Sequence, residues 1–198
     1  MVADLDLYLA SKSPRRRALL AEAGLRFELC EPGEEYVDGS EHGCEVGDPR
    51  TLCEQRARRK ARGAATVGQR APVLAVDTVV DLDGSELGKA KDRAAAEAML
   101  RRLAGSTHAV HTAHCLVAGG REFEETVTAS VRCELVGDEP LASYLDSGQW
   151  RGKAGAYGIQ DDAQGFLELA AGPYDSVVGL HVAAVRRLLR RSAEVRDA

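Results

Sequence analysis

The sequence has few of the features that mark secreted, membrane-bound or nucleic-acid-binding proteins. Its five cysteines are widely spaced and form no CxxC pair, which argues against a disulfide framework and against a zinc knuckle. No apolar run approaches the length needed to cross a membrane, and the N-terminal MVADLDLYLA carries acidic residues where a signal peptide needs basic ones. The net charge is −5, so no excess of positive charge favours nucleic acid. We therefore expect a cytoplasmic protein with neither a membrane nor a nucleic-acid partner.

The length of 198 residues suits a single domain, residues 1–198, with a core of its own. Segments with strand and helix patterns alternate along the chain, and two long strands near the middle read as an antiparallel pair. This order predicts an α/β fold with a mixed central sheet flanked by helices. The expected strands are Leu25–Cys30, Pro72–Asp83, Thr107–Val117 and Glu122–Leu135, and the expected helices include Pro49–Ala65, Arg93–Leu103, Glu139–Ser147 and a final helix capped by Asp175 or Ser176.

The stretch Leu7–Leu20 reads as a short buried strand, a turn and a helix. Ser13 occupies the expected N-cap and Pro14 the first helical position. Three arginines follow in the first turn, although the positive end of the helix dipole disfavours cations there. A bound anion would resolve this conflict, and the hydroxyls of Ser11 and Ser13 with the guanidiniums of Arg15 and Arg16 suit a phosphate. The alternative is a plain capped surface helix.

A lone carboxylate, Asp77, interrupts the apolar strand, where an unpaired acid is costly to bury. We expect it to have a cation or a metal ion as its partner. For the run of basic residues Arg56–Lys60 within the expected helix Pro49–Ala65, a solvated face is the ordinary interpretation, with Lys60 or a neighbour as the candidate that points into a site. In the acidic loop Glu31–Pro49, the carboxylates are either merely solvated at the surface, or Glu34 or Glu35 reaches a metal.

The segment Gly148–Asp162 contains four glycines around Lys153 and Gln160, which favours a backbone that approaches a ligand closely, the alternative being a flexible loop. Three histidines recur at every third position on the strand Thr107–Val117. Alternation along a strand sends His108 and His114 to one face and His111 to the other, so joint zinc binding is geometrically poor.

Several motifs in order resemble those of the Maf family of nucleotide pyrophosphatases. They cover nearly the whole chain: SKSPRR at Ser11–Arg16, RARRKA at Arg56–Ala61, AVDTVV at Ala75–Val80, LGKAKD at Leu87–Asp92, GSTHAVHT at Gly105–Thr112, KAGAYGIQ at Lys153–Gln160 and PYDSVVGL at Pro173–Leu180. The resemblance implies an elongated two-lobed fold with a deep cleft, of the inosine triphosphate pyrophosphatase type. It also implies hydrolysis of a nucleoside triphosphate to the monophosphate and pyrophosphate with Mg²⁺ or Mn²⁺, and the KAGAYGIQ form is similar to the dTTP/UTP subgroup.

The resemblance also assigns roles to individual residues. Asp77 becomes the general base or the metal anchor, with Glu35 as a second metal ligand. The other expected catalytic residues are Lys60 and Lys89, and the expected substrate-binding residues are Ser11, Ser13, Arg15, Arg16, Thr78, Lys153 and Gln160. The acidic loop reads EPGEEYV and the family's IQG reads IQD here. A nucleotide-binding regulatory protein without turnover is therefore the alternative, and the sequence leaves open whether the chain forms a homodimer.

Overall fold

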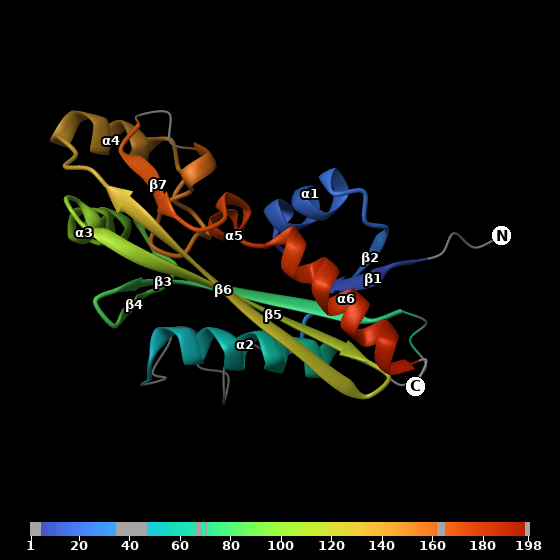
Figure 1. Cartoon of the computed structure of the whole chain (residues 1–198). Coiled ribbons are helices and arrows are strands. Elements are labelled where there is room, and N and C mark those ends of the chain that lie inside the picture. The colour runs from blue at the N-terminus through green and yellow to red at the C-terminus, as the bar shows by residue number, and fades with distance from the viewer. Residues whose placement is uncertain (1–4, 35–46, 66–68, 70, 162–164, 197–198) are drawn as a thin grey trace.

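The computed structural model of the chain describes residues 5–34, 47–65, 69, 71–161 and 165–196 (Figure 1). Its centre is a seven-stranded sheet with the order β2-β1-β3-β5-β6-β7, and β4 pairs with β3. β1 runs parallel to β2 and β3, whereas the remaining pairs are antiparallel. The predicted mixed sheet is thereby confirmed. The strands are β1 (Leu7–Ala10), β2 (Phe27–Cys30), β3 (Val73–Leu82), β4 (Ser85–Leu87), β5 (Thr107–Ala118), β6 (Arg121–Cys133) and β7 (Leu167–Ala171).

Helices cover both faces of this sheet. One face carries α2, which packs against β3 and β5, and the other carries α1, α5 and α6 (Figure 1). The pair α3 and α4 lies with β7 at the far end of the long strands. The helices are α1 (Pro14–Glu22), α2 (Pro49–Ala64), α3 (Arg93–Leu103), α4 (Asp138–Asp146), α5 (Tyr174–Val178) and α6 (Val182–Arg196), with a 3₁₀ turn, η2, at Ile159–Asp161.

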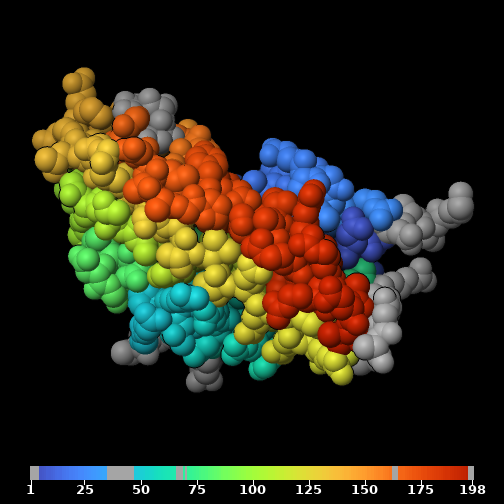
Figure 2. Space-filling model, in the orientation of Figure 1, coloured from blue at the N-terminus to red at the C-terminus, as the bar shows by residue number. Residues whose placement is uncertain are grey.

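Three buried clusters hold these layers together. On one face Leu20 of α1 and Leu188 of α6 meet Leu74 of β3, and burying each such side chain is worth roughly 1.5–3 kcal/mol. In the space-filling view, α6 accordingly lies against both the N-terminal segment and the long strands (Figure 2). On the other face α2 packs with small residues, among them Ala57 and Ala61, so the helix approaches the sheet closely. Within the described residues, every helix is too short or too polar to span a bilayer.

The edge of β3 that faces β1 contains a gap. β1 pairs with this edge over Val73–Ala75, and β4 pairs with it from Val80 onward. The opposite edge pairs with β5 along the whole length, so β1 and β4 share one edge and leave Val76–Val79 between them. Alternation sends neighbouring side chains in this interval to opposite faces. A cavity that opens at the gap can therefore receive residues from both faces of the sheet.

Of two expectations about helix ends, the N-cap position of Ser13 is confirmed and the single final helix needs correction. Ser13 takes the N-cap position of α1, but its side chain makes no capping hydrogen bond. The C-terminal segment is not one helix. α5 ends at Val178 because the φ of 130° at the next residue, Gly179, lies outside the helical region, and α6 begins at Val182. Asp175 still caps α6 from within α5, since its carboxylate accepts from the backbone N–H of Val182 at 2.9 Å.

Candidate active site

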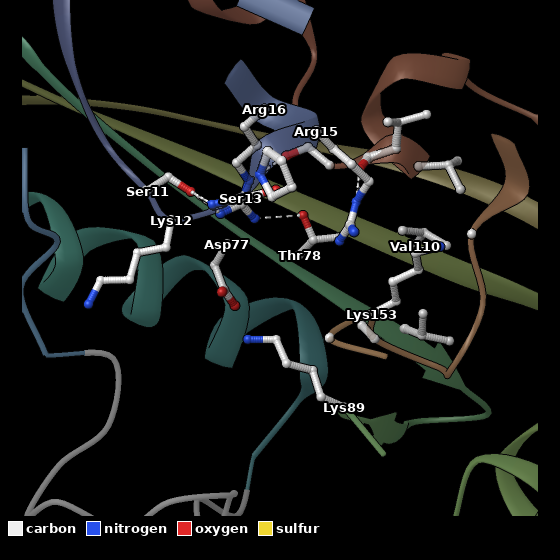
Figure 3. Close-up of a pocket in the computed structure, with 18 of the residues that line it drawn as sticks. Ser11, Lys12, Ser13, Arg15, Arg16, Asp77, Thr78, Lys89, Val110 and Lys153 are labelled. Carbon is white, nitrogen blue, oxygen red and sulfur yellow. Dashed lines mark hydrogen bonds between the residues drawn. The ribbon is translucent and has the colours of Figure 1, made fainter. Parts of the chain in front are cut away.

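A cavity of about 500 Å³ opens at the gap in the sheet edge (Figure 3). Its walls come from the β1–α1 turn, β3, α2, the segment after β4, the loop 151–160 and α5. The charge of these walls is opposite to that of the whole protein. Of the described residues that line it, two are acidic, Asp77 and Glu86, and eight are basic: Lys12, Arg15, Arg16, Arg56, Lys60, Lys89, Arg151 and Lys153. Such a cavity attracts an anionic ligand.

Asp77 lies in the gap of β3 and is almost completely buried. Its Oδ1 accepts a hydrogen bond from the ammonium of Lys60 at 2.7 Å, whereas Oδ2 is buried with no hydrogen-bond partner among the described residues. Burial alone would raise the pKa of this carboxyl. The charge and hydrogen bond of Lys60, with smaller contributions from Arg16 and Arg56, outweigh burial and hold the pKa of Asp77 below its ordinary value. The site thus contains an ionised carboxylate with one unused oxygen.

Arg16 organises the opposite wall. Its guanidinium donates to Ser11 Oγ at 3.1 Å, to Thr78 Oγ1 at 3.2 Å and to the carbonyl of Gly179 at 2.8 Å (Figure 3). It therefore ties β1, β3 and the end of α5 together around the cavity. Thr78 is held a second time by the hydroxyl of Thr112 at 3.1 Å.

The remaining predicted phosphate ligands also line the cavity. Ser13 and Arg15 lie at the start of α1, where the N-terminal N–H groups of a helix favour an anion. Arg15 reaches the carbonyl of Val178 at 3.4 Å, and partial burial lowers the pKa of its guanidinium, which the charge of Asp161 opposes. Lys89 is exposed, and its ammonium and the Asp77 carboxylate point toward the same part of the cavity (Figure 3).

Sequence reasoning missed a second ion pair in the cavity wall. Arg56 is only 2% exposed and donates to both oxygens of Glu86, at 2.5 and 3.0 Å. The signal available in the sequence is spacing, because Arg56 and Lys60 are four residues apart and so share one face of α2. The acidic partner on β4 could not be found this way.

Lys153 and Gln160 of the glycine-rich loop both line the cavity, and next to them lies a residue to which the sequence reasoning assigned no role. Asp161 accepts a hydrogen bond from the Lys153 ammonium and another from the Gln160 amide nitrogen, the latter at 2.7 Å, both on Oδ2. The positive charge of Lys153 is therefore offset within the site. Gly155 and Ala156 both take positive φ, 67° and 60°, which gives the loop its sharp turn toward the cavity.

The three histidines divide between the faces of β5 as the alternation predicts. His111 contacts Asp81 and Thr128 on the α2 side, while His108 bonds the Tyr157 hydroxyl at 2.7 Å and His114 accepts from the N–H of His181 at 2.9 Å. Burial lowers the pKa of His108 and of His114 to about 4. Among the described residues, no three His, Cys, Asp or Glu side chains form a metal-binding group.

The structure describes only part of the acidic loop. Glu34 is exposed and does not lie among the residues that line the cavity, although nearby Pro32 does. Glu35, the expected second metal ligand, lies outside the described residues.

Comparison with known proteins places these residues in context. The family model for Maf-like proteins matches residues 6–192. A dTTP/UTP pyrophosphatase from Thermus thermophilus is 44% identical over 92% of both chains, and one from Pyrococcus horikoshii is 38% identical over 93% of this chain and 95% of the relative. Among solved structures, a HAM1 protein from Coxiella burnetii matches with a TM-score of 0.47 and 16% identity, covering 98% of this chain and 100% of that chain. The chain belongs to the Maf-like family.

Proposed function

We propose that this protein is a nucleoside triphosphate pyrophosphatase that hydrolyses the bond between the α and β phosphates of a pyrimidine nucleotide. The substrate class is dTTP, UTP or a modified pyrimidine nucleotide, and the products are the nucleoside monophosphate and pyrophosphate. The observation that carries this proposal is the buried carboxylate of Asp77, held by Lys60 in a cationic cavity with one oxygen unused. The activity of the related dTTP/UTP pyrophosphatases supports the reaction and the base class.

In this proposal the basic walls of the cavity bind the triphosphate. The start of α1 presents Ser13 and Arg15 beside the Ser11–Arg16 network, and these groups orient the phosphate chain for attack by water. Lys60 and Lys89 lie near Asp77 and neutralise the charge that develops on the departing pyrophosphate. Arg16 donates three hydrogen bonds to other groups of the protein. It therefore fixes the cavity wall and contributes its positive charge to phosphate binding.

The unused oxygen of Asp77 has two roles open to it. It accepts a proton from the attacking water, or it binds a divalent cation that neutralises phosphate charge and activates water when bound. A buried anionic oxygen without a partner fits a cation, and Mg²⁺ needs only one or two carboxylates besides substrate phosphates. Asp77 would hold Mg²⁺ or Mn²⁺, with Glu35 as the further candidate ligand.

Lys153 and Gln160 belong to the other end of the cavity. Gln160 carries an amide able to form hydrogen bonds with the edge of a base, and Lys153 supplies a charge near the phosphates that Asp161 offsets. Residues 1–198 act as one domain in this proposal, because the cavity needs side chains from both the first strand and the last third of the chain.

Pyrophosphate release from a panel of nucleoside triphosphates, with Mg²⁺ or Mn²⁺ present, tests the proposal. We expect turnover of dTTP and UTP that stops when the metal is removed with a chelator. Tight nucleotide binding without any pyrophosphate release would contradict it and favour the regulatory alternative. The variant Asp77→Glu, assayed with the same panel, tests the role of the carboxylate. If Asp77 anchors the metal, this variant should show a changed preference between Mg²⁺ and Mn²⁺.

A further inference from the structure

Three polar groups converge above one glycine at the end of the cavity. A Cβ built on Gly158 would lie 2.6 Å from Asp161 Oδ2 and 2.7 Å from both the Gln160 amide nitrogen and the Lys153 ammonium. No side chain fits at position 158 while these groups keep their places. The cluster of Lys153, Gln160 and Asp161, here called the amide clamp, is therefore tightly packed against the backbone.

Within the amide clamp, Asp161 fixes which way the Gln160 amide points. The amide nitrogen donates to Asp161 Oδ2 at 2.7 Å, and the same oxygen accepts from Lys153. An ionised carboxylate only accepts hydrogen bonds. Rotating the amide by half a turn would place its carbonyl oxygen against Oδ2, so two acceptors would meet and a hydrogen bond would be lost. The carbonyl oxygen of Gln160 consequently remains the group turned away from Asp161.

A fixed carbonyl oxygen discriminates between pyrimidine bases. Uracil and thymine carry an N–H donor at N3, whereas cytosine carries an acceptor at the same atom. We propose that Asp161 is a specificity-determining residue, which holds the Gln160 amide so that its carbonyl oxygen accepts from N3–H of uracil or thymine and disfavours cytosine. This inference rests on the proposed function, because it assumes that the base lies at the Gln160 end of the cavity.

The substitution Asp161→Asn tests this assignment. Asparagine has nearly the same shape, but it can donate as well as accept, so the Gln160 amide can take either orientation. We expect the ratio of kcat/KM for UTP to that for CTP to fall about tenfold, the amount that one hydrogen bond provides. The ratio of the affinities for UMP and CMP, measured by calorimetry, should fall similarly without requiring turnover.

Two further variants separate a specific effect from a structural one. In a Gln160→Ala background, Asp161→Asn should leave both ratios unchanged, because the amide that it orients is gone. Asp146→Asn, an exposed aspartate on α4 outside the cavity, is the matched control and should not alter them.

Specific outcomes overturn the inference. One is a wild-type protein that shows no preference for UTP over CTP. Another is an Asp161→Asn variant that keeps both ratios unchanged. A third is an Asp161→Asn substitution that lowers the ratios as much in the Gln160→Ala background as in the wild type. If the wild type releases no pyrophosphate from any nucleotide, the proposed function fails instead. The UMP and CMP affinities then still decide the role of Asp161.

Discussion

Two buried ion pairs stand one helical turn apart on α2 and differ in how fully they are satisfied. Arg56 uses both oxygens of Glu86, whereas Lys60 uses only one oxygen of Asp77 and leaves the other without a partner. Asp77 lies in the gap of β3 and Glu86 on the adjoining β4, so both acids face α2 at the same edge of the sheet. A carboxylate with both oxygens bonded to a guanidinium has less capacity left for a substrate or a cation than one with an unused oxygen. We infer that the Arg56–Glu86 pair shapes the wall, while the Lys60–Asp77 pair performs chemistry.

Asp77→Asn should have the largest effect of the substitutions suggested here. Asparagine keeps the shape but cannot accept a proton from water or bind a cation as a carboxylate does, so kcat for pyrophosphate release should fall roughly 10³-fold. Asp81→Asn on the same strand, outside the cavity, is the control and should stay within about twofold of the wild type. Equal activity of Asp77→Asn and wild type would remove the distinction between the two pairs.

His114 extends the comparison to a buried group whose two ring nitrogens are both in use. Nδ1 donates to the carbonyl of Glu125 at 3.1 Å and Nε2 accepts from the N–H of His181. Burial lowers the folded-state pKa from 6.5 to about 4, so the unfolded chain binds a proton in this window that the folded chain does not. Stability present above pH 6.5 is therefore lost as the pH falls toward 4, by about 2 to 3 kcal/mol from this residue.

Urea unfolding at pH 7 and at pH 4.5 measures this loss. The variant His114→Leu should show a fall in unfolding free energy between the two pH values that is about 2 to 3 kcal/mol smaller than that of the wild type. His108, whose pKa is also about 4, contributes to the remainder. An identical pH dependence in both proteins would show that His114 is not held neutral by its surroundings.

The Arg56–Glu86 pair should behave as a structural element when broken and replaced. Glu86→Leu removes the two carboxylate oxygens of Glu86 from a guanidinium that is 2% exposed and should lower the free energy of unfolding by about 2 to 3 kcal/mol. The double variant Arg56→Leu/Glu86→Leu should recover most of this loss, because a buried pair and an apolar pair of similar volume are nearly equivalent. Urea denaturation of the wild type, Glu86→Leu and the double variant measures these differences. A double variant less stable than the other two proteins would contradict the prediction.

Much of the fold follows from local patterns in the sequence. The apolar run of β3 predicts its strand almost to the residue, because burial on both faces leaves a nearly continuous hydrophobic signal. The break between α5 and α6 was missed, since a helical pattern continues through Gly179 and only its φ of 130° ends α5. Local pattern therefore predicts elements better than it predicts their ends.

The residues of the candidate site were likewise only partly predictable from local patterns in the sequence. Asp77 could be singled out because a carboxylate in an apolar strand needs a partner, and Lys60 is that partner. Glu86 gave no comparable signal, since an acid in a hairpin is ordinary on a protein surface, and Asp161 stood out only as a departure from the family's IQG motif. Their importance comes from long-range contacts, Glu86 with α2 and Asp161 with Lys153, which depend on how the sheet edge and the loop are folded.

The smallest effect is expected at the start of α1, where Ser13 takes the N-cap position without a capping hydrogen bond. Ser13→Ala should change the free energy of unfolding by less than about 0.5 kcal/mol, whereas Asp92→Ala should cost about 1 kcal/mol because Asp92 accepts from the N–H of Ala95 at 2.8 Å. The Ser13 hydroxyl lines the cavity instead, so Ser13→Ala should raise KM for the nucleotide about threefold. A stability loss equal to that of Asp92→Ala, with KM unchanged, would return Ser13 to the role of an ordinary helix cap.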